Sequence, residues 1–151
     1  MARLGSVVLA RGEDHLVTRH HDGRLAILAW APVDIETAAD DGAHRVRLSI
    51  PLAGGDGSAF ALRRRVDEEA GNAWTAWREM GRPRFPSERQ IDVLHELSTP
   101  ALERSNVAVV DGRVDLDLSL TRHEVTLVEL EPVVDETPPW LDDSRIPGYA
   151  R

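Results

Sequence analysis

The chain has 151 residues, a formal net charge of -8, 42% hydrophobic and 29% charged residues, and no cysteine. This length predicts one globular domain with a core of its own, and it is too short for a complete TIM-barrel enzyme, which needs about 250 residues. Without cysteine or lysine there is no disulfide, thiolate metal site or P-loop lysine, and the acidity argues against nucleic acid or an anionic membrane as partner.

Targeting and membrane signals are also missing from the sequence. The apolar stretch Val7–Ala10 is too short for the core of a signal peptide. Nowhere does the chain have a run of about 18 apolar residues, which a membrane helix requires. The sequence therefore predicts a cytoplasmic protein, or a part of a larger one.

The first third of the chain is patterned as β-strands. His15–His20 and Arg24–Trp30 flank a His-Asp-Gly turn, and its Asp-Gly pair suits a tight hairpin. Asp34–Gly42 is polar and alanine-rich, which predicts a surface loop. His44–Leu52 alternates apolar and polar residues, which predicts a strand with one buried face, and Ser58–Val66 is a further strand.

The periodicity becomes helical in the middle of the chain. Asn72 is a suitable N-cap for a short helix that Gly81 ends. Ser87 and Gln90 then form a capping box, and apolar residues follow at a spacing of three until Pro100. This pattern predicts a helix–loop–helix over residues 72–98.

Strands return after the helices. Asn106–Val110 and Arg113–Leu120 are joined by a second Asp-Gly hairpin signal. Glu124–Glu131 is a last strand. Its alternation slips between Leu127 and Val128, which predicts a bulge or burial on both faces.

Short, hairpin-linked strands without alternating helices predict a mainly β fold. The expected architecture is an antiparallel β-sandwich with an inserted helix–loop–helix. We therefore expect a β-sandwich domain over residues 1–133 and an extended C-terminal tail over residues 134–151, where periodicity is weak.

The histidines do not form a recognisable metal site. His15, His20 and His21 sit around one hairpin, with His44 a candidate neighbour. A metal needs converging ligands, whereas His20 and His21 are consecutive and would point to opposite faces of a strand. The pattern favours surface histidines, and no metal or other cofactor is expected.

The carboxylates are patterned for solubility. Glycosidase-type chemistry needs two carboxyl groups facing each other across a cleft, about 5–10 Å apart. Asp115 and Asp117 instead share the wet face of one predicted strand, and Glu68 and Glu69 lie at the end of a segment. The residues themselves therefore predict no catalytic site.

Tryptophans are the remaining candidates for a binding role. Trp74 and Trp77 are three residues apart on the first predicted helix, a spacing that favours a core and, in part, an interface. Trp140 follows Pro138 and Pro139 in the tail, outside the predicted core, which favours docking against a partner domain. Stacking of these tryptophans on a sugar ring is the alternative role.

Several segments together resemble one known family. Residues 71–87 carry the pattern W-x-x-M-G-x-P-x-x-P-S and resemble a segment of glycoside hydrolase family 39, which contains β-xylosidases and α-L-iduronidases. The similarity runs from about Leu4 over nearly the whole chain. Its further segments are Val17–Trp30, Gln90–Leu94, Leu116–Leu120, Arg122–Leu130 and Glu136–Trp140.

The resemblance implies an accessory role. In this family a catalytic (β/α)8 barrel carries the acid/base and nucleophile glutamates of a retaining mechanism. The segment similar to this chain is the C-terminal β-sandwich with its helix–loop–helix, which packs against the barrel. No position of this sequence matches the catalytic glutamates, so no catalytic residue is carried over and the chain alone is expected to be inactive.

Two functions remain open from the sequence. The first is a non-catalytic accessory domain, or fragment, of a bacterial family-39-like hydrolase such as a xylan 1,4-β-xylosidase, with the barrel as partner in cis or in trans. Family sandwiches also tend to recruit a strand from the chain ahead of the barrel, and that strand is expected to be absent here. The second is a stand-alone carbohydrate-binding module for xylo-oligosaccharides, and homo-oligomerisation is open in both cases.

Overall fold

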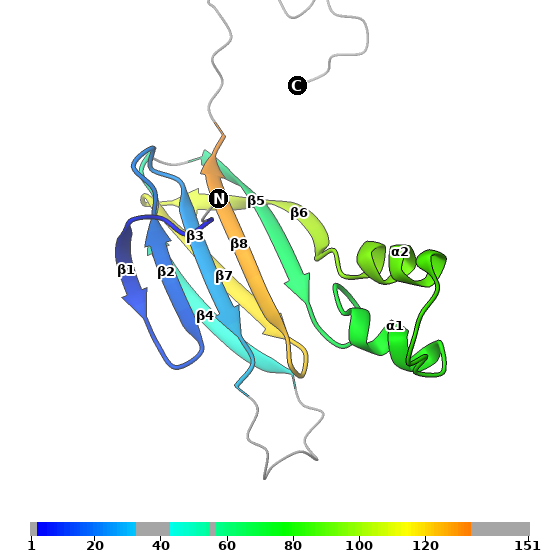
Figure 1. Ribbon diagram of the computed structural model, residues 1–151. Coiled ribbons are helices and arrows are strands. Elements are labelled where there is room, and N and C mark those ends of the chain that lie inside the picture. The colour runs from blue at the N-terminus through cyan, green and yellow to red at the C-terminus, as the bar shows by residue number, and fades with distance from the viewer. Residues whose placement is uncertain (1–2, 33–42, 55–56, 134–151) are drawn as a thin grey trace, which may run out of the picture.

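The computed structural model describes residues 3–32, 43–54 and 57–133. Over these residues, eight strands form one antiparallel sheet and two helices are inserted between β5 and β6 (Figure 1). The strands are β1 (Val7–Arg11), β2 (His15–Arg19), β3 (Leu25–Trp30), β4 (His44–Pro51), β5 (Gly57–Val66), β6 (Ala101–Val110), β7 (Arg113–Leu120) and β8 (Val125–Pro132). The helices are α1 (Ala73–Glu79) and α2 (Glu88–Leu97). The predicted mainly β fold with an inserted helix–loop–helix is confirmed.

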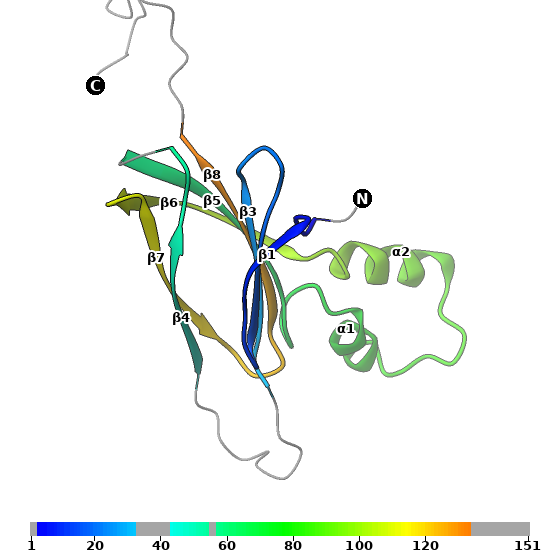
Figure 2. The same ribbon diagram turned by 90° about the vertical axis from the view of Figure 1, so that its left-hand side faces the viewer.

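The two layers of the fold belong to one curled sheet. Its strand order is β1-β2-β3-β8-β5-β6-β7-β4. β6 pairs with β7 only at Val109–Val114 and Val110–Arg113, so the sheet bends there and β7 and β4 face the other strands as a second layer. Figure 2 shows β4 and β7 on one side of β3 and β8, and the helices on the opposite side.

The core lies between these layers. Alternation along β4 and β7 directs Val46, Ile50, Val114 and Leu120 inward, as the sequence predicts, and all four are buried. Apolar residues of the larger layer meet them, chiefly Val17, Leu25, Ile27, Ala29, Ala59, Ala61, Val128 and Leu130. Burial of each large apolar side chain contributes about 1.5–3 kcal/mol, so this interior is the main source of stability.

Local signals place the turns and the helix ends as predicted. Asp111 and Gly112 both have positive φ angles (51° and 67°), the conformation that an Asp-Gly hairpin requires. Ser87 accepts a hydrogen bond from the Gln90 N–H, and the Gln90 side chain accepts one from the Ser87 N–H, which completes the capping box. The Asn72 side chain caps α1 in the same way.

Three features differ from the sequence prediction. The edge strand β1 was not expected, and β6 begins at Ala101, five residues earlier than predicted. The predicted bulge in β8 is wrong, because β8 pairs residue for residue with both β3 and β5. Burial on both faces of β8 is correct instead, since Leu127 is half-buried on one face and Val128 is buried on the other.

The predicted loop 34–42 and the tail 134–151 lie outside the described residues. Within the part of the chain that the structure describes, neither helix is long and apolar enough to cross a membrane.

Candidate docking surface

The two candidate tryptophans of α1 have different environments. Their rings stack with centroids 5.0 Å apart. Trp77 is half-buried, and its Nε1 donates a hydrogen bond to the carbonyl oxygen of Pro83 (3.1 Å), which ties the connecting loop to the helix. Trp74 is 59% exposed, so it is not a core residue. The other three candidates, Trp140, Pro138 and Pro139, lie outside the described residues.

The helices project from the sheet and leave apolar side chains uncovered. We call residues 73–97 the helical hairpin (Figure 1). None of the residues of α2 is buried. Phe85 is 85% exposed, and Ile91 and Leu97 are also exposed. The helical hairpin therefore has an apolar surface that the rest of the described chain does not cover.

One outer face of the fold is polar, as expected for a surface in water. The outward residues of β4 and β7 include Arg45, Arg47 and Asp117, all exposed. The Asp117 carboxylate lies 3.5 Å from Arg47 Nε and 3.9 Å from Arg45 Nη1. Asp115 shares this wet face, as the sequence predicts. An antiparallel sheet with one buried and one solvated face normally has this distribution.

The opposite outer face, on β3, β8 and β5, is apolar at one end. Leu28 pairs across the strands with Leu127, and Trp30 pairs with Val125. All four point away from the core, because their neighbours along the strands, such as Ile27 and Val128, point into it. Val125 is 45% exposed and the other three are half-buried. We call these four residues the apolar face; the helices lie on the same side of the sheet (Figure 2).

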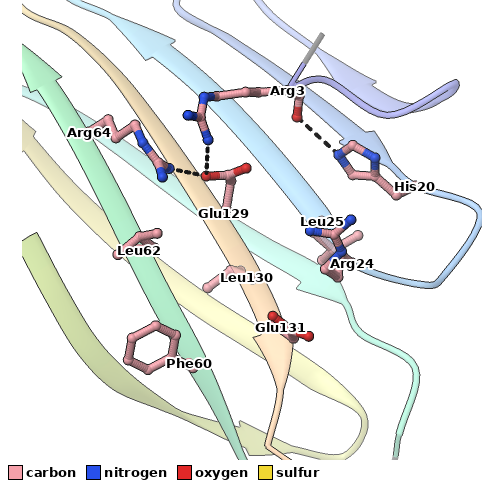
Figure 3. Close-up of a pocket in the computed structure, with 10 residues that line it drawn as sticks. All are labelled: Arg3, His20, Arg24, Leu25, Phe60, Leu62, Arg64, Glu129, Leu130 and Glu131. Carbon is pink, nitrogen blue, oxygen red and sulfur yellow. Dashed lines mark hydrogen bonds and ion pairs between the residues drawn. The ribbon is translucent and has the colours of Figure 1, made fainter. Parts of the chain in front are cut away.

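The other end of this outer face is charged and partly covered by the N-terminal segment. Here a pocket of about 230 Å³ is lined by Phe60, Arg64, Glu129 and their neighbours (Figure 3). Glu129 forms ion pairs with Arg64 and with Arg3 (3.5 Å). His20 Nε2 donates a hydrogen bond to the carbonyl oxygen of Arg3 (3.0 Å), which holds the N-terminal segment on this face.

A cleft opens where β6 and β7 diverge. Its volume is about 350 Å³, and its apolar lining includes Ala61, Val107, Leu116 and Val128. Among the described residues, β6 pairs with β7 at only two positions, so residues 101–108 and 115–120 have no strand partner along this cleft. The layer formed by β7 and β4 therefore covers only part of the larger layer, which has six strands. An extended segment could pair with these free strand edges.

Two buried carboxylates were not singled out by the sequence. The Glu124 carboxylate binds Arg63, and that of Asp67 binds Arg65. Glu124 and Asp67 are both buried, which excludes them from reacting with a solvent-borne substrate. No local pattern identified them, because each partnership depends on strand pairing or on the loop after β5.

Asp67 is a charged carboxylate in spite of its burial. Burial acts most strongly and would raise its pKa, but the N–H groups of Ala70 and Glu69 and the Arg65 guanidinium outweigh it, so the pKa lies below its ordinary value. Within the described residues, no three histidine or carboxylate side chains are grouped to hold a metal ion. Each of the two buried carboxylates instead binds an arginine of β5.

Comparisons with known proteins agree on one enzyme family. The sequence model of Glycosyl hydrolases family 39 matches residues 2–115. A β-xylosidase of Geobacillus stearothermophilus is 36% identical over 150 residues, which are 97% of this chain and 29% of that protein.

Solved structures show the same relationship. A monomeric β-xylosidase of Caulobacter crescentus superposes with a TM-score of 0.59 and 26% identity, over 82% of this chain and 27% of that one. A bacterial orthologue of human α-L-iduronidase gives a TM-score of 0.62 and 28% identity, over 87% of this chain and 25% of that one. The chain thus spans less than a third of the relatives that it matches.

Proposed function

The chain belongs to glycosyl hydrolase family 39, and from this membership we propose that it is the non-catalytic accessory β-domain of such an enzyme. Its role is to pack against and support a catalytic (β/α)8 barrel outside these 151 residues. The observation that carries the proposal is the apolar face beside the helical hairpin, because a monomeric domain rarely leaves such surfaces uncovered. Residues 1–133 form the domain, and residues 134–151 are a docking tail.

The contrast between the two outer faces supports this orientation. The wet face of β4 and β7 has paired, exposed charges, whereas the apolar face and the exposed Trp74 lie on the opposite side of the sheet. The described chain begins on that side too, where Arg3 is bound to Glu129 (Figure 3). A barrel joined ahead of Arg3 would therefore lie on the side of the sheet that carries the apolar face. Pro138, Pro139 and Trp140 would add contacts from the tail.

The cleft between β6 and β7 supports a second connection. The family resemblance implies a strand from the chain ahead of the barrel, and the free edges at residues 101–108 and 115–120 can accept one. Such a strand would cover Leu116 and Val107 and complete the smaller layer. The accessory domain would then be fastened to the enzyme by backbone hydrogen bonds as well as by apolar contact.

The reaction belongs to the barrel. A retaining glycosidase needs its two carboxyl groups about 5–5.5 Å apart across a cleft. Asp115 and Asp117 lie on the wet face, and Glu124 and Asp67 are buried in ion pairs. The relatives named β-xylosidase favour a β-xyloside as the substrate of the whole enzyme.

A complementation experiment tests the proposal. The barrel portion of the Geobacillus stearothermophilus β-xylosidase, with its own matching segment deleted, is mixed with this chain. We expect co-elution and a gain in turnover of a chromogenic xyloside, and no turnover by the chain alone. Val125→Asp should weaken the association at least tenfold, whereas the matched control Ser119→Asp on the wet face should not. Turnover by the chain alone, or association lost only with Ser119→Asp, would contradict the proposal.

A carbohydrate-binding module is the second candidate function, because the exposed Trp74 offers a stacking surface. Titration with xylo-oligosaccharides, followed by tryptophan fluorescence, separates the two. A saturable response that Trp74→Ala removes would favour the module. No response at millimolar sugar would reject it.

A further inference from the structure

The pocket at the charged end of the outer face has an apolar floor (Figure 3). Phe60 lies within β5 and is still 39% exposed, so its ring is available for contact with a ligand. Leu62 lies beside it and is half-buried. The two side chains share one face of β5, because residues two apart in a strand point to the same side.

Strand pairing places two carboxylates beside this floor. Phe60 is directly opposite Glu131 in the register of β5 and β8, and Leu62 is directly opposite Glu129. Within the described residues, the exposed Glu131 carboxylate forms no hydrogen bond or ion pair. The two arginines that bind Glu129 both bind Oε2, and neither binds Oε1. The pocket therefore has carboxylate oxygens that can accept hydrogen bonds from a ligand.

Guanidinium groups supply hydrogen-bond donors to the same pocket. Arg24 binds Asp22 through Nε (2.8 Å), and its two Nη groups take no part in that bond. Arg3 reaches Glu129 with one Nη (3.5 Å), and its other Nη takes no part in that pair. Donors and acceptors thus lie side by side around the apolar floor.

The N-terminal wall of the pocket is fixed by close backbone contact. The Gly5 N–H donates to the hydroxyl of Thr18 (2.9 Å). A Cβ atom at Gly5 would lie 2.2 Å from the carbonyl carbon of Arg19, so a residue with a side chain could not lie this close to β2. A wall that is already in place lowers the cost of ordering a site when a ligand binds.

The charges and the size of the pocket together select a class of ligand. An anion would lie beside Glu129 and Glu131, and a cation would lie beside Arg3 and Arg24. A hydroxyl group both donates and accepts, so a neutral ligand with several hydroxyl groups suits both kinds of side chain. The volume of about 230 Å³ is below the roughly 300–1,000 Å³ of pockets for drug-sized molecules, which suits a single small ring.

We propose that this pocket binds one pyranose-sized ring of a neutral sugar. The C–H groups of the ring contact Phe60 and Leu62, which removes apolar surface from water. One hydroxyl group donates to the Glu131 carboxylate, and another accepts from an Nη group of Arg24. Binding at this site requires neither Trp74 nor a barrel.

An NMR titration of the whole chain with methyl β-D-xylopyranoside tests the site. We expect saturable shifts of the amides around Phe60 and Glu131, with a dissociation constant in the millimolar range, because one ring makes few contacts. Methyl β-D-glucuronide adds a carboxylate to the same ring. It should bind about fivefold more weakly, since its charge would approach the two pocket carboxylates.

Variants assign the binding to this pocket. Phe60→Ala should weaken binding about tenfold, whereas Phe60→Trp keeps an aromatic surface and should bind. Glu131→Ala, at an exposed position, removes an acceptor without altering the core and should also weaken binding. Trp74→Ala is the matched control and should bind as the native chain does. No saturable shift at high millimolar xyloside, tighter binding of the glucuronide, native-like binding by Phe60→Ala or Glu131→Ala, or loss of binding in Trp74→Ala would overturn the proposal.

Discussion

Arg63 Nη2 lies 2.5 Å from Oε1 of Glu124, a side chain that is only 1% exposed. The other carboxylate oxygen of Glu124 accepts the N–H (2.8 Å) and the hydroxyl (3.1 Å) of Thr121. Arg63 also donates from Nε to the hydroxyl of Thr126 (3.0 Å). This buried, well-bonded pair fixes the β7–β8 turn against β5.

Glu124→Ala should be one of the most destabilising single changes in the chain. It removes the buried partner of Arg63 and leaves that charge with the exposed Glu103 carboxylate at 3.6 Å. Loss of one member of a buried pair costs up to about 3–5 kcal/mol. Urea unfolding at pH 7 measures the change. The matched control is Asp117→Asn, which removes an exposed carboxylate from Arg45 and Arg47 and should cost less than about 1 kcal/mol. Equal losses in the free energy of unfolding would show that burial does not determine how much these ion pairs contribute to stability.

Asp67 should make the fold sensitive to acid. Its pKa is lower in the folded chain than its unfolded value of about 3.9, so its contribution is present above that pH and is lost as the pH falls through the folded pKa. The free energy of unfolding should therefore decline below about pH 4.

The variant Asp67→Asn isolates this effect. It should be less stable at pH 7, by about 1–3 kcal/mol, because the bond to Arg65 loses its charge. Its decline in acid should be shallower than that of the native chain. Asp22→Asn is the control, since Asp22 is exposed and solvent screens its pairing with Arg24. A native-like decline in Asp67→Asn would contradict the assignment.

Strands β4 and β7, the Asp-Gly hairpins and the start of α2 could be predicted from local sequence patterns. The alternation of β4 and β7 follows from a one-sided core, and the Asp-Gly hairpins and the capping box depend on backbone preferences within a few residues. Edge strand β1 was missed because Val7 and Val8 are exposed and alternate with nothing buried. Its bulge against β2 weakens the periodicity further.

Side-chain interactions between residues far apart in the sequence could not be predicted from local patterns. Arg63 and Glu124 are 61 residues apart and meet only through the register of β5 and β8. Asp14 and His44 are 30 residues apart, at opposite ends of the strand order, and meet because the sheet curls. The sequence shows two consecutive apolar residues, Leu127 and Val128, that interrupt the alternation of the strand. Only the structure shows that Leu127 belongs to the apolar face on the outside of the sheet.

The capping box should contribute measurably to the stability of α2, because this helix has no buried residue that would stabilise it by packing. Ser87→Ala removes the acceptor of the Gln90 N–H and should reduce the helicity of α2, at a cost of about 1 kcal/mol. Exchange of the α2 amides measures this local change. Ser98→Ala is the comparison at the other end: its hydroxyl donates to the His95 carbonyl oxygen but satisfies no free helix N–H. Similar effects of both variants would contradict a specific role of the box.

Variants of Trp74 and Trp77 should distinguish a role in docking from a role in stability. Trp77→Ala removes a half-buried ring and its hydrogen bond to Pro83, so the helical hairpin should lose on the order of 2 kcal/mol of local stability. Trp74→Ala removes a ring that is 59% exposed, so the isolated chain should unfold almost as the native chain does. If the helical hairpin docks on the barrel, Trp74→Ala should nevertheless weaken the association at least tenfold, as truncation of a central aromatic contact does.

Native-like association of Trp74→Ala would confine docking to the apolar face. A large loss of stability in Trp74→Ala would instead mean that its ring packs within the fold.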